Sequence, residues 1–586
     1  MLTPAQRRGA GGMFVLMLIG VLLETLGVGL VIPALALMTQ SDLTIRYPWL
    51  SPYLARAGNP SHGQLVVAGM LALVGVTGLR AVYLTWLAWW QSRFVYGIQI
   101  EVSQRLFAGY LRQPYAFHLQ RNSAHLIRNT INQADEITNV FLQGLNLSTE
   151  VSVLVSIAIL LVVVEPFGAL LVMGILGAAG WAFSQLTRSH TARWGAARQV
   201  HERLRLQYLQ QGLGGAKDVK LLGRESEFLA RYLHQSRGSA DVARRQATLT
   251  ALPRLCLELL AVTGLAGVVV AMLQRGKPMD AVLPTLGVFA AAAFRLMPSV
   301  NRALGAIQSI RFSWPAIDNI AGELAIVGGA GEPRRGPLLP FQRALSLRHV
   351  TFRYESADRD AVRGISLSIP SGASVGFIGG SGAGKSTLVD LILGLFAPTS
   401  GVVEVDGVDI QANVRGWQDQ IGYVSQAIYL TDDTLRRNVA FGLPDASIDE
   451  PALARAIRAA RLDALVSELP HGLETVVGER GVRLSGGQRQ RIGIARALYH
   501  DPSVLVLDEA TSSLDLDTER EVMDAVRALR GDKTLLIVAH RLSTVEDCDR
   551  LFRLEDGCVV EEGGAAAVLR HRHGAGALPH NLNDVK

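Results

Sequence analysis

Cysteine is scarce in this chain, and the few cysteines present form no recognisable pattern. The 586 residues include three, Cys256, Cys548 and Cys558, without the spacing of a metal site or the regular pairing of a disulfide framework. Two of them lie in the second half, which suits a reducing cytosol. A disulfide-stapled domain and a cysteine-based metal site are therefore excluded from the interpretation.

The chain also lacks any nucleic-acid-binding motif and any clear cleavable signal. Arg7 and Arg8 precede an apolar stretch that is longer than the core of a signal peptide, and no clear A-x-A site follows it. The formal net charge is +6, but without a motif it does not indicate a nucleic-acid partner. We interpret the basic excess first as lysine and arginine in cytosolic loops of a membrane protein.

Long uncharged runs are plentiful in the first half. Hydrophobic residues make up 49% of the chain, and a membrane-spanning helix needs about 20 of them in succession. The sequence predicts six spans, at roughly 12–38, 64–90, 149–165, 167–187, 253–274 and 281–303. Only Glu165-Pro166 separates the third from the fourth, which indicates a tight turn. Glu24 and Pro33 within the first span predict a bend.

Two long polar stretches, 94–148 and 188–250, connect these spans on one side, and the second is rich in arginine. Because lysine and arginine favour the cytosolic side, both stretches and both termini are predicted to be cytosolic. Apolar residues at helical spacing indicate that the membrane helices continue into the cytosol. Pro114–Phe117 and Gly212–Gly215 are candidates for short coupling segments, or else ordinary loop breakers. On the other side, 46–58 is either a short interfacial helix or an irregular loop with aromatic residues.

The remaining sequence divides the chain into domains. Glycine and proline are frequent at 323–343, which predicts a linker. It follows a membrane domain at 1–322. Strand-like runs, short helices and turns then predict an α/β domain at 344–586.

A phosphate-binding loop is the most informative motif of the second half. It fits G-x-x-x-x-G-K-[ST] between an apolar strand-like run and a helix-like segment, which is the context that this motif requires. The glycines let backbone N–H groups surround phosphates at a helix N-terminus. Lys385 is expected to reach the β- and γ-phosphates of ATP, and Ser386 to hold Mg²⁺. The loop residues are Gly379, Gly380, Ser381, Gly382, Ala383, Gly384, Lys385 and Ser386, with Thr387 following.

Two carboxylates end a later apolar strand, 504–507. Asp508 is expected to support Mg²⁺, and Glu509 to polarise the water that attacks ATP. A pair of acids at a strand end can also be a solvated cap, but the phosphate loop earlier in the chain favours the catalytic interpretation.

A second anion-binding helix start follows Leu484. Ser485, Gly486, Gly487 and Gln488 place a serine and two glycines before a helix, a pattern suited to phosphate. One domain has no second triphosphate for them to bind. They are therefore expected to close over the nucleotide of a partner domain, with two ATP molecules sandwiched between two chains.

The ordered set of motifs resembles the nucleotide-binding domain of ATP-binding cassette transporters. By that resemblance, Tyr354 stacks on adenine and Gln426 senses Mg²⁺ and the attacking water. Asp515 is the inter-subunit aspartate, and His540 contacts the γ-phosphate. No motif residue is substituted, so the site is expected to be an active ATPase that uses ATP and Mg²⁺. Six spans followed by one cassette resemble an exporter-type half-transporter, which a homodimer would complete.

Short patches of the first half resemble the bacterial flippases for lipid-linked oligosaccharides. They include Glu24-Thr25-Leu26, Pro253-Arg254 and Arg295–Ser299. This resemblance implies a multi-pass protein of the bacterial inner membrane, with the cassette in the cytosol. It implies transport of a polyprenyl-pyrophosphate oligosaccharide.

Arginines within the predicted spans are consistent with an anionic cargo. A charge inside the membrane usually faces a wet cavity, and guanidinium pairs bidentately with phosphate. Internal salt bridges to Glu24 or Glu258, or snorkelling to the interface, are the alternatives. The candidate cavity residues are Arg80, Arg254, Arg295 and Arg302.

Two other functions remain open. The chain could export another amphipathic cargo, such as a lipid A-like lipid, a drug or a peptide, because the cassette does not discriminate among cargoes. It could also be an ATP-gated sensor or channel, although the presence of both Glu509 and His540 argues against a gate that merely binds ATP.

Overall fold

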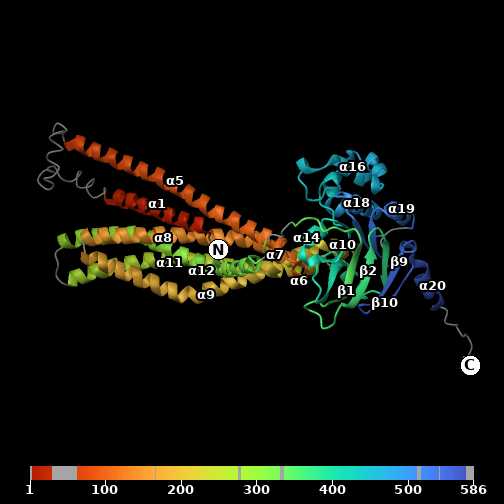
Figure 1. Ribbon diagram of the computed structural model, residues 1–586. Coiled ribbons are helices and arrows are strands. Elements are labelled where there is room, and N and C mark those ends of the chain that lie inside the picture. Colours follow the sequence, from red (N-terminus) through yellow and green to blue (C-terminus); the bar gives the residue numbers. More distant parts are fainter. Residues whose placement is uncertain are drawn as a thin grey trace, which may run out of the picture. The chain divides into compact units, whose positions relative to one another are not determined.

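The structure is a computed structural model that describes residues 3–29, 62–164, 166–274, 279–329, 331, 336–510, 516–539 and 541–575. The chain forms two compact units (Figure 1). The first comprises Met1–Gln113 and His118–Gly331, and the second comprises Pro114–Phe117 and Glu332–Lys586.

Long helices build the first unit. They are α1 (Pro4–Gly29), α5 (His62–Leu111), α8 (Asn132–Val164), α9 (Pro166–Gly214), α11 (Glu225–Gln274) and α12 (Met279–Val327). α5 and α11 have 50 residues each. At 1.5 Å per residue each is about 75 Å long, whereas the hydrocarbon core of a bilayer is about 30 Å thick. These helices therefore extend far beyond any bilayer that they cross, as the sequence predicts.

Within the described residues, four helical stretches are long and apolar enough to cross a membrane. They are Pro4–Leu26, Val66–Leu111, Ser123–Leu160 and Glu225–Gly264. Helices α9 and α12 run without interruption through the predicted spans 167–187 and 281–303. The helical membrane half is confirmed and is consistent with six spans.

Short helices mark both predicted coupling segments. Pro114 separates α5 from α6 (Tyr115–Gln120), which is followed by α7 (Ser123–Thr130). Gly215 is the N-cap of α10 (Ala216–Leu221) and directly follows the end of α9. Both segments therefore coincide with breaks between helices. The segment 46–58 and the predicted bend at Pro33 lie outside the described residues.

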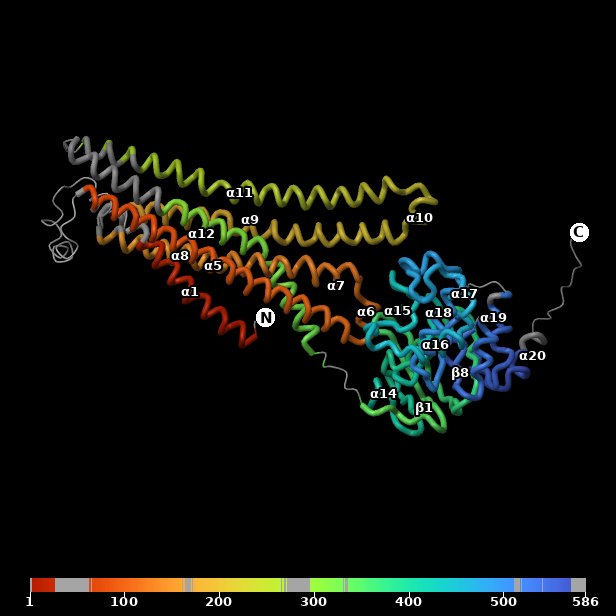
Figure 2. Tube along the Cα trace, turned by 90° about the horizontal axis from the view of Figure 1, so that it is seen from above, coloured from red at the N-terminus to blue at the C-terminus, as the bar shows by residue number. Residues whose placement is uncertain are grey.

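Helices α8, α9, α11 and α12 lie side by side, as Figures 1 and 2 both show. Their shared core includes Val153, Leu176, Leu257 and Leu296, one from each helix. α9 and α12 approach closely at Gly195, where an added Cβ would lie 2.1 Å from the backbone oxygen of Phe312. A side chain at that position would force the two helices apart.

Two β-sheets form the second unit. The four-stranded antiparallel sheet has the order β2-β1-β4-β5, and the six-stranded sheet has the order β10-β9-β3-β8-β7-β6. In the second sheet all neighbours pair in parallel except β10 with β9. The strands are β1 (Ala344–Phe352), β2 (Val362–Pro370), β3 (Ser374–Gly379), β4 (Ser400–Val405), β5 (Val408–Asp409), β6 (Ile421–Val424), β7 (Val504–Asp508), β8 (Thr534–Val538), β9 (Arg550–Glu555) and β10 (Cys558–Gly563).

The helices of this unit pack around the sheets, and buried apolar side chains on both faces of the six-stranded sheet form two cores. They are α13 (Lys385–Ile392), α14 (Val414–Gln418), α15 (Leu435–Val439), α16 (Glu450–Ala459), α17 (Asp463–Glu468), α18 (Gly486–Leu498), α19 (Leu516–Arg527) and α20 (Ala565–Ala575).

The region predicted as a linker, 323–343, begins inside a helix. α12 continues to Val327, and Glu323 is buried there, where it accepts hydrogen bonds from Tyr110 and Arg121. β1 begins at Ala344.

Candidate functional site

The predicted nucleotide residues gather at one edge of the six-stranded sheet. β3, β6, β7 and β8 run parallel, so their carboxyl ends lie at the same edge. β3 leads into the phosphate loop, β6 is followed by Gln426, and β7 ends at Asp508. Ligands of open α/β sheets bind at this edge.

The phosphate loop turns from β3 into the N-terminus of α13. Gly384 precedes the helix with φ of 96°, and an added Cβ would lie 2.5 Å from the backbone oxygen of Ala361. Glycine is therefore required there for its conformation and for space. The loop presents backbone N–H groups at a helix N-terminus, where a phosphate is favoured.

Lys385 is held inside this loop. Its Nζ donates hydrogen bonds to the backbone oxygens of Gly379, at 3.0 Å, and Gly380, at 2.9 Å. Burial lowers the pKa of Lys385, while the carboxylates of Glu509 and Asp508 act in the opposite direction. The ammonium group that is predicted to bind ATP phosphates thus donates its hydrogen bonds to two backbone carbonyls in this structure.

The two acids after β7 take different positions. Asp508 accepts a hydrogen bond from the Tyr423 hydroxyl at 3.4 Å. Glu509 has φ of 49°, which is uncommon for a residue with a side chain. Gln426 Nε2 donates to Glu509 Oε2 at 2.6 Å, so the predicted water-polarising carboxylate and the predicted sensor glutamine are in direct contact.

A third acid, Asp390 on α13, was not among the predicted site residues. Burial raises its pKa to about 6, and the nearby charge of Asp508 acts in the same direction. Burial, with Asp508 next, also raises the pKa of Tyr423. The surroundings of Asp508 thus disfavour further negative charge.

The side chains predicted to bind Mg²⁺ have suitable chemistry. Ser386, Gln426 and Asp508 offer hydroxyl, amide and carboxylate oxygens, which are the ligands that this cation prefers. Among the described residues there is no group of three or more His, Cys, Asp or Glu that could hold a metal.

Tyr354, the predicted adenine contact, is connected to the phosphate loop. Its hydroxyl forms a 2.9 Å hydrogen bond with Thr387 Oγ1. Its ring packs edge-on against Phe352 and Phe396, with centroid distances of 5.1 and 5.6 Å. The half-buried ring is therefore fixed beside the loop that is predicted to hold the phosphates of the same nucleotide.

The second glycine-rich motif forms the start of α18. Ser485 is the N-cap: its hydroxyl accepts from Gln488 N at 3.2 Å, and its own N–H donates to Gln488 Oε1 at 2.8 Å. Gly486 begins the helix and Gly487 is buried in it. Ser485 is exposed, so this helix N-terminus is presented to solvent. The other two predicted ATP-site residues, Asp515 and His540, lie outside the described residues, and their roles stay predictions.

Three predicted cavity arginines form ion pairs. Arg80 Nη2 lies 3.0 Å from Glu24 Oε1, and Arg254 Nε lies 2.8 Å from Glu258 Oε1. These are the salt bridges that the sequence offered as an alternative. Arg302 pairs with Glu150 through two nitrogens, one of them 3.0 Å from Glu150 Oε2. Arg295 lies on α12, and its side chain is outside the part that the structure describes.

Sequence reasoning missed Glu150 and Tyr423. Glu150 is the second residue of the third predicted span, and an acid at that position was itself a signal for a partner of Arg302. Tyr423 lies three residues before Gln426 on β6, so its proximity to the same sheet edge could have been inferred.

Two family models match the chain. A model described as ABC transporter matches residues 362–512, and one described as ABC transporter transmembrane region matches residues 12–277. Together they cover the helical unit through the end of α11, and the part of the α/β unit that holds the phosphate loop, the Ser485 motif and Asp508-Glu509.

Curated relatives align with most of the chain. A protein of Cupriavidus metallidurans named ATP-dependent lipid A-core flippase is 32% identical over 520 residues, which are 88% of this chain and 86% of that protein. One of Ralstonia nicotianae with the same name is 34% identical over 502 residues, covering 84% and 83%. A solved bacterial Atm1-family ABC exporter with ATP bound has a TM-score of 0.77 over 98% of this chain and 99% of that one, at 23% identity. That likeness shows the fold.

Proposed function

The chain belongs to the ABC transporter family, and from that premise we propose that it flips a phosphorylated glycolipid across the bacterial inner membrane. It binds ATP and couples ATP hydrolysis to transport as a multi-pass exporter of the lipid flippase type. The finer part of the proposal is the cargo, for which a polyprenyl-pyrophosphate oligosaccharide is our first candidate. Lipid A-core is the second, because the relatives carry that name.

The observation that carries the cargo proposal is the set of arginine–glutamate pairs in the helical unit. Arg254 and Arg302 are 72% and 55% exposed in the single chain. A glutamate neutralises each arginine while no cargo is present, which lowers the cost of a charge within a membrane helix. A phosphate group can displace the carboxylate, because guanidinium binds both anions with the same bidentate geometry.

The nucleotide site supports a homodimer. The N-terminus of α18 with Ser485 is exposed and has no phosphate of its own chain to bind. Leu213, Leu221 and Leu222, around the predicted second coupling segment, are 72%, 80% and 67% exposed in the single chain. A second copy would cover these leucines and place its Ser485 motif over the nucleotide.

The proposed mechanism uses the contacts around Lys385 and Glu509. Lys385 leaves the carbonyls of Gly379 and Gly380 to bind the phosphates of ATP. Glu509 polarises the attacking water, while Gln426 fixes the orientation of its carboxylate. Ser386, Gln426 and Asp508 would hold Mg²⁺, which neutralises charge on the β- and γ-phosphates. His540 and Asp515 are proposed to contact the γ-phosphate and the partner subunit.

Closure of the two cassettes over ATP is proposed to open the bundle toward the outer leaflet. The segments at Pro114–Phe117 and Gly212–Gly215 would transmit this closure, with the cassettes in the cytosol. Hydrolysis then resets the transporter.

A reconstituted flipping assay tests the proposal. Purified protein in vesicles is given a polyprenyl-pyrophosphate oligosaccharide, lipid A-core or an uncharged glycolipid, and accessibility of the headgroup is followed with and without ATP. We expect ATP-dependent movement of at least one phosphorylated cargo and none of the uncharged one. Equal movement of all three would reject the phosphate requirement, and ATP turnover without movement of any lipid would favour a sensor, a channel or a drug or peptide exporter.

A further inference from the structure

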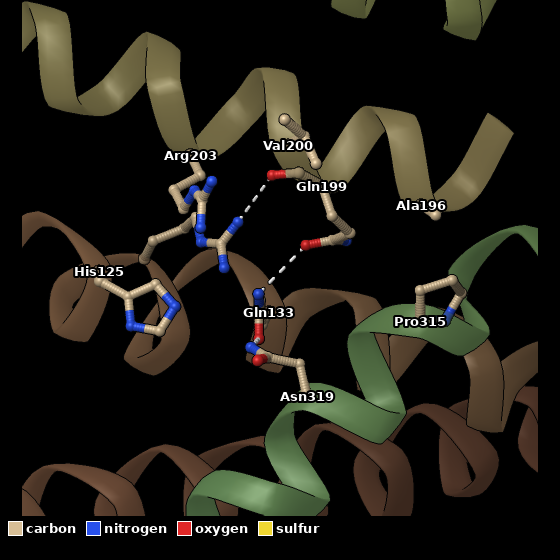
Figure 3. Close-up of a pocket in the computed structure, with 9 residues that line it drawn as sticks. His125, Gln133, Ala196, Gln199, Val200, Arg203, Pro315 and Asn319 are labelled. Carbon is tan, nitrogen blue, oxygen red and sulfur yellow. Dashed lines mark hydrogen bonds between the residues drawn. The ribbon is translucent and has the colours of Figure 1, made fainter. Parts of the chain in front are cut away.

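A small polar cavity lies within the helical unit, away from the nucleotide site (Figure 3). It has a volume of about 260 Å³ and opens among α7, α8, α9 and α12. This is below the roughly 300–1,000 Å³ of pockets for drug-sized molecules. The cavity therefore suits a compact ligand, and its polar lining includes His125, Arg128, Gln133, Gln199, Arg203 and Asn319.

Positive charge dominates this lining. Arg128 on α7 and Arg203 on α9 both line the cavity, as does His125. Among the described residues, no aspartate or glutamate lines it. Glu202, next to Arg203 in sequence, pairs with Arg198 at 2.8 Å, and Glu323 pairs with Arg121 at 2.7 Å.

Arg128 is a buried charge in the lining of this cavity. It is 5% exposed, and within the described part of the chain it has no carboxylate partner. Its Nη1 donates to the Gln199 backbone oxygen at 2.9 Å and its Nη2 to Asn129 Oδ1 at 3.4 Å. Its Nε is buried without an acceptor. Buried charges are normally paired and buried donors bonded, so an acceptor with negative charge is missing.

The carboxamides of the lining connect three helices. Gln133 Nε2 donates to Gln199 Oε1 at 3.1 Å, and Asn319 Nδ2 donates to Gln133 Oε1 at 2.5 Å. Each carboxamide offers both donors and acceptors. These carboxamides can therefore bind the remaining oxygens or hydroxyls of an oxyanion.

The cavity lies well outside the predicted membrane spans. Gln133 precedes the third span, Gln199 follows the fourth and Asn319 follows the sixth by 12 to 16 residues, or about 18–24 Å of helix. A lipid headgroup at the bilayer surface would not reach that depth, so the occupant is expected to come from the cytosol.

We propose that this cavity is a binding site for a soluble phosphate-class anion, held by Arg128 and Arg203 and assisted by His125. The anion supplies the missing negative charge beside Arg128 and joins α7 to α9. Arg128 also contacts Asn129, which donates to the Tyr110 hydroxyl at 3.3 Å. Through Tyr110 the network reaches Glu323 and Arg121, so an occupied site stiffens the helices that follow the first predicted coupling segment.

Local hydrogen–deuterium exchange on the full-length protein tests this site. Exchange is measured with inorganic phosphate and with chloride at equal ionic strength, in peptides covering 123–133 and 196–205. We expect phosphate to protect both peptides. The phosphate loop, which is another phosphate site, is followed separately in peptides around 379–388, so binding there is not mistaken for binding in the cavity.

Arg203→Gln is the decisive variant, because Arg203 is exposed and forms no ion pair among the described residues. Loss of one charged hydrogen-bonding partner should raise the phosphate concentration for half-protection about tenfold or more. Arg193→Gln removes an exposed arginine outside the cavity on the same helix. This variant should leave the phosphate concentration for half-protection unchanged. Arg128→Gln should abolish protection, and the test does not depend on how well that variant folds.

Three results would overturn the proposal. One is unchanged exchange in both peptides of the wild type on addition of phosphate. Another is equal loss of protection in Arg203→Gln and Arg193→Gln, which would indicate a general charge effect. The third is protection that requires vesicles of anionic lipid and not free phosphate, which would assign the site to a headgroup.

Discussion

The two units use phosphate-binding chemistry in different ways. In the α/β unit the phosphate-binding groups are close in sequence: a glycine-rich loop, its lysine and a helix N-terminus. Gln426 and Glu509, which are 83 positions apart, contact each other directly. In the helical unit the predicted cavity arginines Arg80, Arg254 and Arg302 are each paired with a glutamate on the same or another helix. Arg302 and Glu150 are 152 positions apart. The phosphate loop is thus formed by neighbouring residues, whereas a phosphate of the cargo would have to displace the paired glutamates.

The largest expected effect separates hydrolysis from binding. Glu509→Gln removes the carboxylate that polarises water but keeps the size of the side chain and a possible contact with Gln426. ATP turnover should fall by at least about 10²-fold, while binding of a fluorescent ATP analogue stays within about threefold. Near wild-type ATP turnover of this variant in a phosphate-release assay would show that Glu509 does not polarise the attacking water.

The next effect concerns the helical unit. Arg254→Ala should reduce flipping of the phosphorylated cargo about tenfold, since it removes a charged hydrogen-bonding partner. Basal ATP turnover should change by less than about twofold, because the residue lies outside the nucleotide site. Arg244→Ala is the matched control on the same helix, because Arg244 forms a similarly exposed pair with Asp241. Equal transport losses in both variants would contradict a cargo contact.

A double-mutant cycle sharpens the interpretation of the less exposed pair. Arg80 and Glu24 are 27% and 17% exposed. If the pair is structural, Glu24→Gln and Arg80→Gln each lower thermal stability and the double variant recovers part of it, with a coupling energy of about 0.5–3 kcal/mol. If Arg80 also binds cargo, Glu24→Gln keeps transport and Arg80→Gln loses it. Parallel loss of transport in both single variants would leave Arg80 as a structural residue.

The smallest expected effect is on how the stability of the α/β unit depends on pH. Burial raises the pKa of Asp390 to about 6, above its ordinary value, so the folded state holds this proton more tightly than the unfolded state does. Asp390 therefore destabilises the fold above pH 6, and this penalty is relieved as the pH falls through 6 toward 4. Asp390→Asn should raise the free energy of unfolding by on the order of 1–2 kcal/mol at pH 7.5, a value discounted for the partial exposure of the side chain.

Thermal unfolding of the full-length protein at several pH values measures this difference. The gain in stability of Asp390→Asn over the wild type should become smaller between pH 7 and pH 5, where the wild-type carboxyl takes up its proton. A gain of the same size at pH 5 would assign the effect to packing and not to charge.

Features of each unit could be predicted from the sequence where the residues involved are close together in the chain. The phosphate loop, the Asp508-Glu509 pair and the Ser485 motif are contiguous, and their backbone conformation follows from glycine, a helix start or a strand end. The long helices were also predicted, because apolar periodicity is local. The pairing of Arg302 with Glu150 and the contact of Tyr423 with Asp508 depend on register between distant elements. The raised pKa of Asp390 depends on burial, which a one-dimensional pattern does not report.

The length of α5 and α11 has a mechanical consequence. A rigid rod of about 75 Å that tilts by about 5° moves its far end by roughly 6–7 Å. α9 and α12 have 49 residues each, and their backbones approach so closely at Gly195 that a tilt of one is coupled to a tilt of the other. A change of a few degrees in the cytosolic part therefore becomes a displacement at the opposite ends that is larger than the diameter of a water molecule.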